Sequence, residues 1–332
     1  MEFVSEQVGW VATYFGPLYR TAGTGWIALQ TPRDGPVEMF DFVGTQIGWG
    51  IAHYARGAQY GCAQAAPAGI PPCRSALLFT QDGGATWDER LVLPLVASAN
   101  GSLPMRGLVA IDHHTLWLLV NTGGDSEVRL TVDGARSWRT VLAMPGLTTL
   151  EADGKNGAWV VAATATGSDV LRTTDGGRHW TRALSGKAYA LTRVGSELWV
   201  LDRDGAYCTS SNCSEYRLRH SADGGTSWTD LGNPKVSATC TRGHLGRPSF
   251  SDRDLLTGYI PISLGAGGVQ GGEGGLLVTG DGGRSWRCET TPPNVTRVAA
   301  VMGTAYAVSR DRVLGTDSVW RQGPSGWTRT LP

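Results

Sequence analysis

The chain has 332 residues, and its 29 lysines and arginines balance its 29 aspartates and glutamates, so the formal net charge is zero. A neutral balance gives no electrostatic support for a nucleic-acid or membrane-surface partner. No apolar stretch is long enough to predict a membrane span. Glycine (47) and tryptophan (13) are abundant, and a chain of this length ordinarily holds two domains unless a repeat architecture overrides that expectation.

The first predicted unit has a strand at residues 8–10, a turn at 15–17 and a further strand at 27–29. Residues 20–26 within it are a degenerate copy of a sequence motif that recurs along the chain. Better copies stand at 80–87, 131–138, 173–180, 221–228 and 279–286, and a second degenerate copy stands at 322–327. Their pattern is close to Ser/Thr-x-Asp-x-Gly-x-Ser/Thr-Trp. Each copy lies between two short β-prone runs, which predicts a hairpin turn.

The residue types of this repeat suit a turn. An aspartate side chain can accept hydrogen bonds from the backbone N–H groups just ahead of it. Glycine tolerates a positive φ, and the tryptophan ring can be buried against a neighbouring turn. We therefore predict a structural and not a catalytic role for the five aspartates. These are Asp82, Asp133, Asp175, Asp223 and Asp281.

A second series of aromatic residues lies on predicted strands upstream of the repeats. Its members are Trp10, Trp49, Trp117, Trp159, Trp199, Tyr259 and Tyr306. In three units the distance from the strand aromatic to the repeat tryptophan is the same, 21 residues. Successive repeat tryptophans are 41 to 61 residues apart, which matches the span of a four-stranded propeller blade. Seven strand aromatics for seven repeats predict seven blades.

The repeat resembles the Asp-box, or BNR repeat, of sialidase-like and sortilin-like β-propellers. Tandem repeats with strand Gly-Trp pairs are also similar to the seven-bladed photosystem II assembly factor of plants and cyanobacteria. The resemblance covers essentially the whole chain and is specific for fold, not for activity. It implies an all-β, seven-bladed β-propeller with four-stranded antiparallel blades and a single domain over residues 1–332. The expected blades are 1–32, 37–95, 107–145, 146–185, 188–232, 247–291 and 294–332.

The expected blades differ in their connections. Extra residues fall between the second and third strands of blades two, five and six, and the linkers near 97–106 and 232–246 are long. In an up-and-down blade, both kinds of connection lie on one rim, which we call the elaborated rim. The repeated turns lie on the opposite, plain rim. Variable loops on a rigid scaffold commonly carry binding sites, so we predict binding at the elaborated rim.

Six cysteines are an even number, and their spacing matches no metal-ligand pattern, so no metal site or cofactor is predicted. The natural proposal pairs Cys62 with Cys73, Cys208 with Cys213 and Cys240 with Cys288. Other pairings and free thiols stay open. Disulfides imply an oxidising compartment. We therefore expect an extracellular, periplasmic or cell-surface protein, although no signal segment is visible.

Arginine and tyrosine dominate the polar residues expected at the elaborated rim and the channel mouth. The candidate ligand-binding residues are His53, Tyr54, Arg56, Tyr60, Arg106, Arg203, Tyr207, Arg242, His244 and Arg310. These residue types suit an anionic or sugar-like ligand. The alternative is that they are ordinary solvated loop residues.

We predict a secreted, disulfide-stapled propeller that acts as a binding or scaffold module, with a protein or glycan partner on the elaborated rim. The alternative is a carbohydrate-active hydrolase or polysaccharide lyase at the channel mouth, where a lyase would use residues such as His53 and Tyr54. A glycosidase needs two facing carboxylates. The acids outside the repeats, Asp41, Asp153, Asp252 and Asp254, offer no convincing pair.

The known enzymes with similar folds fit this sequence poorly. Sialidases carry an Arg-Ile-Pro-type motif before the first repeat and have six blades, and this chain lacks that motif and has seven predicted blades. Xyloglucan-cleaving glycosidases place their cleft between two tandem propellers, and this sequence offers one. Sialidase activity is therefore not expected.

Overall fold

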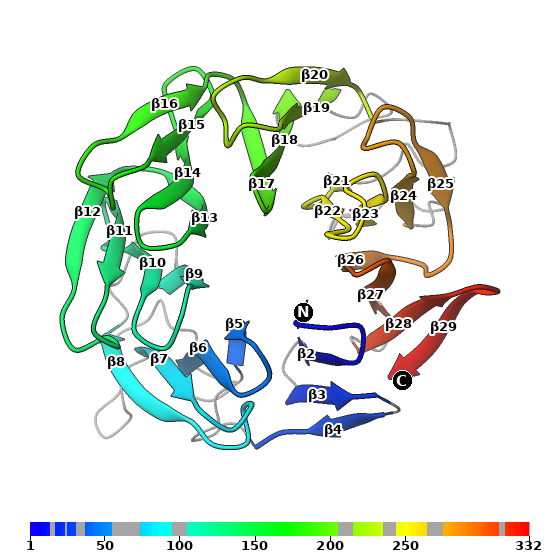
Figure 1. Cartoon of the computed structure of the whole chain (residues 1–332), viewed down its shortest axis with the longest axis horizontal. Helices are drawn as coiled ribbons and strands as arrows, with labels where there is room; N and C mark the ends of the chain where they lie inside the picture. The colour runs from blue at the N-terminus through cyan, green and yellow to red at the C-terminus, as the bar shows by residue number, and fades with distance from the viewer. Residues whose placement is uncertain are drawn as a thin grey trace, which may run out of the picture.

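The computed structural model describes residues 1–13, 17–23, 25–30, 37–54, 74–94, 105–204, 215–234, 244–263, 275–311 and 316–331. Its strands form seven antiparallel sheets arranged in a ring (Figure 1). Each sheet is one blade, so the predicted all-β, seven-bladed propeller is confirmed. Within the described ranges there is no helix that is long and apolar enough to cross a membrane.

The first four blades follow the chain in order. Blade 1 contains β1 (Glu2–Phe3), β2 (Val8–Ala12), β3 (Leu18–Ala22) and β4 (Trp26–Ala28). Blade 2 contains β5 (Val37–Val43), β6 (Ile47–Tyr54), β7 (Arg74–Thr80) and β8 (Asp88–Pro94). Blade 3 contains β9 (Met105–Ala110), β10 (Leu116–Asn121), β11 (Ser126–Thr131) and β12 (Arg139–Met144). Blade 4 contains β13 (Leu147–Asp153), β14 (Gly157–Ala163), β15 (Ser168–Thr173) and β16 (Thr181–Leu184).

The last three blades complete the ring. Blade 5 contains β17 (Ala188–Val194), β18 (Glu197–Asp204), β19 (Glu215–Ser221) and β20 (Thr229–Gly232). Blade 6 contains β21 (His244–Leu245), β22 (Ser249–Phe250), β23 (Gly258–Ser263), β24 (Leu276–Thr279) and β25 (Arg287–Glu289). Its first strand is divided, because β21 and β22 both pair with β23. Blade 7 contains β26 (Val295–Val301), β27 (Thr304–Arg310), β28 (Asp317–Gly323) and β29 (Gly326–Leu331).

The hydrophobic core lies between neighbouring blades. One cluster joins Trp117 and Val128 of blade 3 to Leu150 and Val160 of blade 4, and similar clusters fill the other interfaces. The second strands are covered on both faces, so they read as continuous apolar runs and not as alternating patterns. β10, for example, is buried at five of its six positions.

The strand aromatics tie each blade to the next one. In six of the seven, the indole N–H or the tyrosine O–H donates a hydrogen bond to a residue of the following blade, at 2.5–3.3 Å. The pairs are Trp10 to Gly83 O, Trp49 to Asp112 O, Trp117 to Gly154 O, Trp159 to Gly224 O, Tyr259 to Gln322 Oε1, and Tyr306 to Glu6 O. At the remaining interface, the Trp199 ring stacks on Phe250 with centroids 4.0 Å apart. The bond from Tyr306 runs from blade 7 to blade 1 and closes the ring.

The repeat tryptophans reach in the opposite direction. Four of them donate to the outermost strand of the preceding blade at 2.9–3.1 Å: Trp26 to Thr330 Oγ1, Trp180 to Val141 O, Trp228 to Ala183 O, and Trp327 to Glu289 Oε2. These rings therefore pack on the preceding blade as well as on their own turn. Two series of aromatic residues therefore join the blades: the strand aromatics bond to the following blade, and the repeat tryptophans bond to the preceding one.

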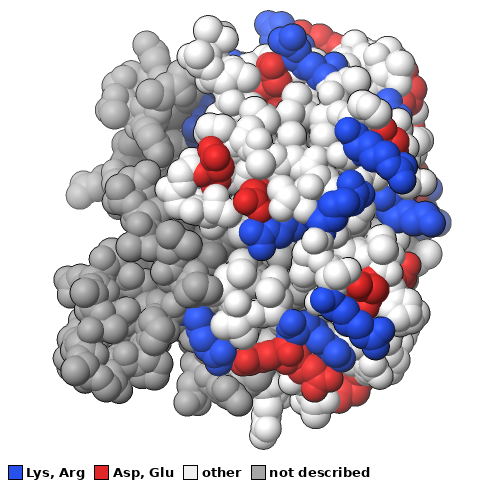
Figure 2. Space-filling view, turned by 90° about the vertical axis from the view of Figure 1, so that its left-hand side faces the viewer, with Lys and Arg blue, Asp and Glu red and all other residues white. Residues whose placement is uncertain are grey.

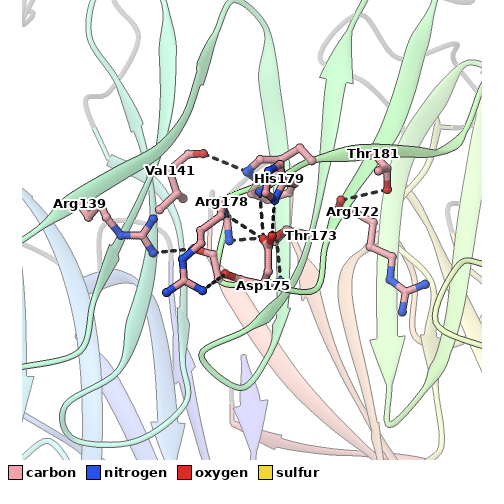
Figure 3. Close-up of polar contacts among 11 residues, drawn as sticks. Arg139, Val141, Arg172, Thr173, Asp175, Arg178, His179 and Thr181 are labelled. Carbon is pink, nitrogen blue, oxygen red and sulfur yellow. Dashed lines mark hydrogen bonds and ion pairs between the residues drawn. The ribbon is translucent and has the colours of Figure 1, made fainter.

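The turn at residues 173–180 shows the geometry of the repeat (Figure 3). Asp175 Oδ1 accepts hydrogen bonds from Thr173 Oγ1 at 2.9 Å and from the backbone N–H groups of Arg178 and His179 at 3.0 Å each. The Thr173 hydroxyl in turn accepts from Gly177 N at 2.9 Å. Gly177 has a φ of +78°, a conformation that glycine adopts without steric cost.

The same hydrogen bonds recur in the turns at Asp82, Asp133, Asp223 and Asp281. In blade 1 and blade 7, the corresponding turns lack the aspartate. The five aspartates therefore act within their own turns, each holding the backbone that follows it.

The strand directions define the two rims. Because every blade is an up-and-down sheet, the first hairpin and the repeated turn lie at one end of each blade, and the second strand ends at the other. β6, β18 and β23 end at this second rim, and the stretches 55–73, 205–214 and 264–274 that follow them lie outside the described residues. On the outer side of the ring, acidic and basic side chains are interspersed (Figure 2).

Candidate functional site

A cavity of about 860 Å³ lies on the propeller axis. The first strands of all seven blades contribute to its lining, from Glu2 and Phe3 in blade 1 to residues 296–301 in blade 7. The first strand of each blade begins at the elaborated rim and ends at the plain rim. The position of a residue along that strand therefore gives its depth in the channel.

One register position recurs on the inner strands, directly opposite the strand aromatic. In chain order it is occupied by Glu2, Asp41, Val109, Glu151, Thr192, Ser249 and Ala299. Five of these seven side chains are polar, and three are carboxylic acids. Because the position is equivalent in each blade, these side chains form one layer around the axis.

Two of these acids connect three blades. Both carboxylate oxygens of Glu2 lie 3.0 Å from Phe42 N of blade 2, and Asp41 Oδ2 accepts from Ala110 N of blade 3 at 2.7 Å. The pKa of Glu2 is raised by burial and also by the neighbouring Asp41 carboxyl group. Burial raises the pKa of both carboxyl groups, as expected for acids held away from water.

An arginine links the opposite side of the channel. Arg247, in the gap between β21 and β22, forms an ion pair with Glu151 of blade 4 and donates from Nε to Thr192 Oγ1 of blade 5 at 3.1 Å. Burial raises the pKa of Glu151, and the positive charges of Arg247 and Arg193 oppose that shift. This network therefore holds blades 4, 5 and 6 together across the axis.

The channel mouth at the elaborated rim has a different character. Glu38, Arg106 and Tyr189 lie near the beginnings of their first strands and line the cavity. Arg106 is exposed, and Tyr189 is 37% exposed. The guanidinium of Arg203 lies 4.3 Å above the centroid of the Tyr189 ring, in a cation–π contact. The mouth therefore presents an aromatic ring beside cationic groups.

His53 lies close to this mouth but is buried. Its Nδ1 is 2.5 Å from Ser75 Oγ, and its Nε2 is 4.0 Å from Glu38 Oε2. Burial lowers the pKa of His53 to about 4. The imidazole is thus neutral at pH 7 and is placed to support Ser75 and not to carry charge into the channel.

The remaining sequence candidates are distributed differently. Arg310 forms an ion pair with Asp317 in blade 7, with Nε and Oδ1 2.9 Å apart. His244 pairs in register with Ser263 on the divided edge of blade 6. The side chain of Tyr54, and all of Arg56, Tyr60, Tyr207 and Arg242, lie outside the described residues. Of the ten candidates, the described structure places Arg106 in the lining of the channel, Arg203 against the lining residue Tyr189, and His53 beside the lining residue Glu38.

Sequence reasoning missed the acids and arginines of the inner layer. It named Asp41 but found no partner for it, and it passed over Glu2, Glu151 and Arg247. One signal was available: the inner-layer residue stands eight positions before the strand tryptophan in each of the first four blades. Glu2, Asp41 and Glu151 share that spacing, so alignment of the units would have grouped them.

No protein-family model matches the sequence, and no curated protein resembles it significantly. Solved structures do resemble it. The GH74 enzyme of Niastella koreensis aligns over 99% of this chain with a TM-score of 0.65 and 13% identity. The GH74 xyloglucanase of Xanthomonas campestris aligns over 98% with a TM-score of 0.65 and 15% identity. In both cases this chain covers only 53% of the longer protein.

A further neighbour has a more similar length. YCF48 of Cyanidioschyzon merolae aligns over 92% of this chain and 88% of its own, with a TM-score of 0.56 and 16% identity. At these identities the comparisons establish the propeller fold. The chain spans about half the length of the two GH74 enzymes, so their activities do not transfer to it.

Proposed function

We propose that this protein is a binding or scaffold module that holds a protein or glycan partner at the channel mouth on its elaborated rim. The observation that carries the proposal is the mouth itself, where Tyr189 and Arg106 line a cavity of about 860 Å³ and Arg203 lies against the Tyr189 ring. Tyrosine offers a flat apolar face with a polar tip, and arginine offers planar donors for anions and hydroxyl groups.

The carboxyl groups deeper in the channel favour binding over hydrolysis. A glycosidase needs one carboxyl group free to protonate the leaving group and another free to act on the sugar or on water. Glu2 and Asp41 are instead engaged with backbone N–H groups of the next blade, and Glu151 is engaged with Arg247. Their positions support a role in joining blades.

The finer features of the sequence analysis belong to the same proposal. We propose that the five repeated turns are Asp-boxes with a structural role, in one domain that spans residues 1–332. We also propose that the three predicted disulfides fasten the elaborated rim of a secreted protein. A disulfide at Cys288 supports this, because stable disulfides are typical of oxidising compartments. His53, Tyr54, Arg56, Tyr60, Tyr207, Arg242, His244 and Arg310 complete the proposed binding rim.

A glycan array that includes acidic and neutral oligosaccharides tests this function. The wild-type protein is compared with an Arg106→Ala/Tyr189→Ala double variant and with Arg178→Ala, which changes an exposed arginine in a plain-rim turn. We expect the double variant to lose at least tenfold in affinity and Arg178→Ala to bind as wild type does. Equal binding by the double variant, or turnover of a bound polysaccharide, would overturn the proposal.

A further inference from the structure

A second cavity, of about 500 Å³, lies on blade 5 and shares no lining residue with the channel. We call it the blade 5 pocket, and its lining residues are Gly186, Lys187, Asp202, Tyr216, Arg217, Arg219 and Asn233. All of them except Arg219, which lies further along β19, are near strand ends at the elaborated rim or in the links between blades at that rim. The pocket is therefore open to the same side of the molecule as the channel mouth.

Asp202 is the buried acid of this pocket, with a relative exposure of 6%. Its Oδ2 forms an ion pair with Arg219 Nε at 2.8 Å. Asp202 Oδ1 is buried and lacks a hydrogen-bond partner among the described residues. An unsatisfied buried acceptor is unusual in a folded protein. A hydroxyl group of a bound molecule would satisfy this oxygen by donating a hydrogen bond to it.

The charge of the blade 5 pocket indicates which class of ligand it would bind. Among its described lining residues are three cationic side chains, Lys187, Arg217 and Arg219, and one acid, Asp202, so these residues together carry a formal charge of +2. Arg217 also pairs with Asp230 at 2.7 Å, and inclusion of Asp230 leaves +1. Arginines in such a setting favour carboxylate or phosphate ligands, which they can bind through paired N–H groups.

We propose that the blade 5 pocket binds an acidic sugar residue, a hexuronate. Its carboxylate would pair with Arg217 and Arg219, and one of its hydroxyl groups would donate to Asp202 Oδ1. A volume of about 500 Å³ is within the range of small-molecule pockets and far exceeds the space that one water molecule needs. The inference rests on the proposed function as a glycan-binding rim and assigns a ligand class to a separate pocket on that rim.

Isothermal titration with digalacturonate, and with the neutral disaccharide galactobiose, tests the pocket. We expect digalacturonate to bind at least tenfold more tightly than galactobiose. Arg217→Gln removes a 58% exposed cation without disturbing the core, and we expect it to weaken digalacturonate binding at least tenfold. Arg182→Gln is the matched control, because Arg182 is 62% exposed on β16 and does not line the pocket.

Two further measurements make the test decisive. Asp202→Asn keeps the size of the side chain, and we expect weaker digalacturonate binding with an unchanged circular-dichroism spectrum. Acetate and inorganic phosphate are titrated as small anions, and affinity equal to that of digalacturonate would overturn the assignment to a sugar. Wild-type affinity in Arg217→Gln would overturn it as well.

The outcome can be separated from that of the channel-mouth proposal. If Arg106→Ala/Tyr189→Ala abolishes digalacturonate binding and Arg217→Gln does not, the channel mouth is the site and the pocket inference is wrong. If only Arg217→Gln weakens binding, the pocket inference holds, and the channel mouth does not bind this ligand.

Discussion

At the scale of single residues, the strand tryptophans act as hydrogen-bond donors between blades, although they lie on apolar strands. Trp117 is fully buried, and its indole N–H donates to Gly154 O of the next blade at 3.0 Å. Trp199 is buried to the same degree, but its Nε1 has no partner among the described residues. A comparison of variants at these two positions therefore separates the stability contributed by ring packing from that contributed by the N–H donor.

This difference leads to a prediction about stability. Trp117→Phe removes the donor of a partly buried hydrogen bond, so we expect a loss of about 0.5–1.5 kcal/mol beyond the cost of the smaller ring. Trp199→Phe should show only the cost of the smaller ring. Urea unfolding of both variants measures the difference. Equal losses would contradict the assignment of an interblade hydrogen bond to Trp117.

His53 gives a second prediction, on pH. Its folded pKa of about 4 lies below the ordinary value of 6.5, so the unfolded chain binds a proton more readily between these values. The stability contributed by neutral His53 is therefore present above pH 6.5 and is lost as pH falls toward 4. The expected loss is up to about 3 kcal/mol.

Denaturant unfolding at pH 7 and pH 4.5 measures this loss. His53→Gln should reduce the pH dependence over this interval. His113→Gln, at an exposed position in the β9–β10 hairpin, is the control and should leave it unchanged. If His53→Gln retained the full pH dependence of the wild-type protein, burial of His53 would not be its cause.

At the scale of elements, the repeated turn works as a self-contained unit. Hydrogen bonds from the backbone and side chain of His179 to the Asp175 carboxylate hold the pKa of that aspartate far below its usual range. The other four turns show the same direction. For Asp82, hydrogen bonds from Thr86 and Thr80 outweigh the opposing effect of burial. The ionised form is thus favoured by the folded turn.

Removal of one turn carboxylate should change how the melting temperature depends on pH. Asp175→Asn should lower Tm at pH 7, because the stabilising contribution of a depressed carboxyl pKa is present above the unfolded value near 4. This contribution is lost as pH falls through the folded pKa, so the Tm values of variant and wild type should converge in acid. Asp125→Asn, in the exposed β10–β11 turn, is the control for thermal melting. A Tm difference that grew as the pH fell would contradict the stabilising role of the carboxylate.

Sequence patterns predicted the elements well where the determinants are local. A turn needs its own aspartate, hydroxyl and glycine residues, all within eight positions, so the five turns were visible in the sequence. The inner layer depends on contacts across the ring. Arg247 meets Glu151, 96 positions earlier in the chain, and the spacing within a single unit does not indicate which blades face each other.

At the scale of the whole molecule, blades 1 and 7 share no strand in the described part of the chain. Every strand of blade 1 comes from residues 2–28, and every strand of blade 7 comes from residues 295–331. Side chains make the junction. The Phe3 and Tyr306 rings stack with centroids 3.8 Å apart, and Arg297 Nη2 donates to Ala12 O at 2.6 Å. The count of seven blades was predictable from the aromatic residues, but these closing contacts join distant parts of the chain and were not.

The channel combines two roles that are separated by depth. Near the plain rim, Glu2, Asp41 and Glu151 join blades, and near the elaborated rim, Tyr189 and Arg106 line the cavity, with Arg203 against the Tyr189 ring. The proposed binding role places the ligand at the mouth and leaves the inner acids to hold the blades together.

The most direct test incubates the wild-type protein with polygalacturonate and with xyloglucan, and measures both retention in affinity electrophoresis and release of reducing ends or unsaturated products. We predict retention by polygalacturonate without any product. Product formation that disappears in Glu151→Gln or Asp41→Asn would show that the inner carboxyl groups are catalytic, and it would contradict a binding role without turnover for this propeller.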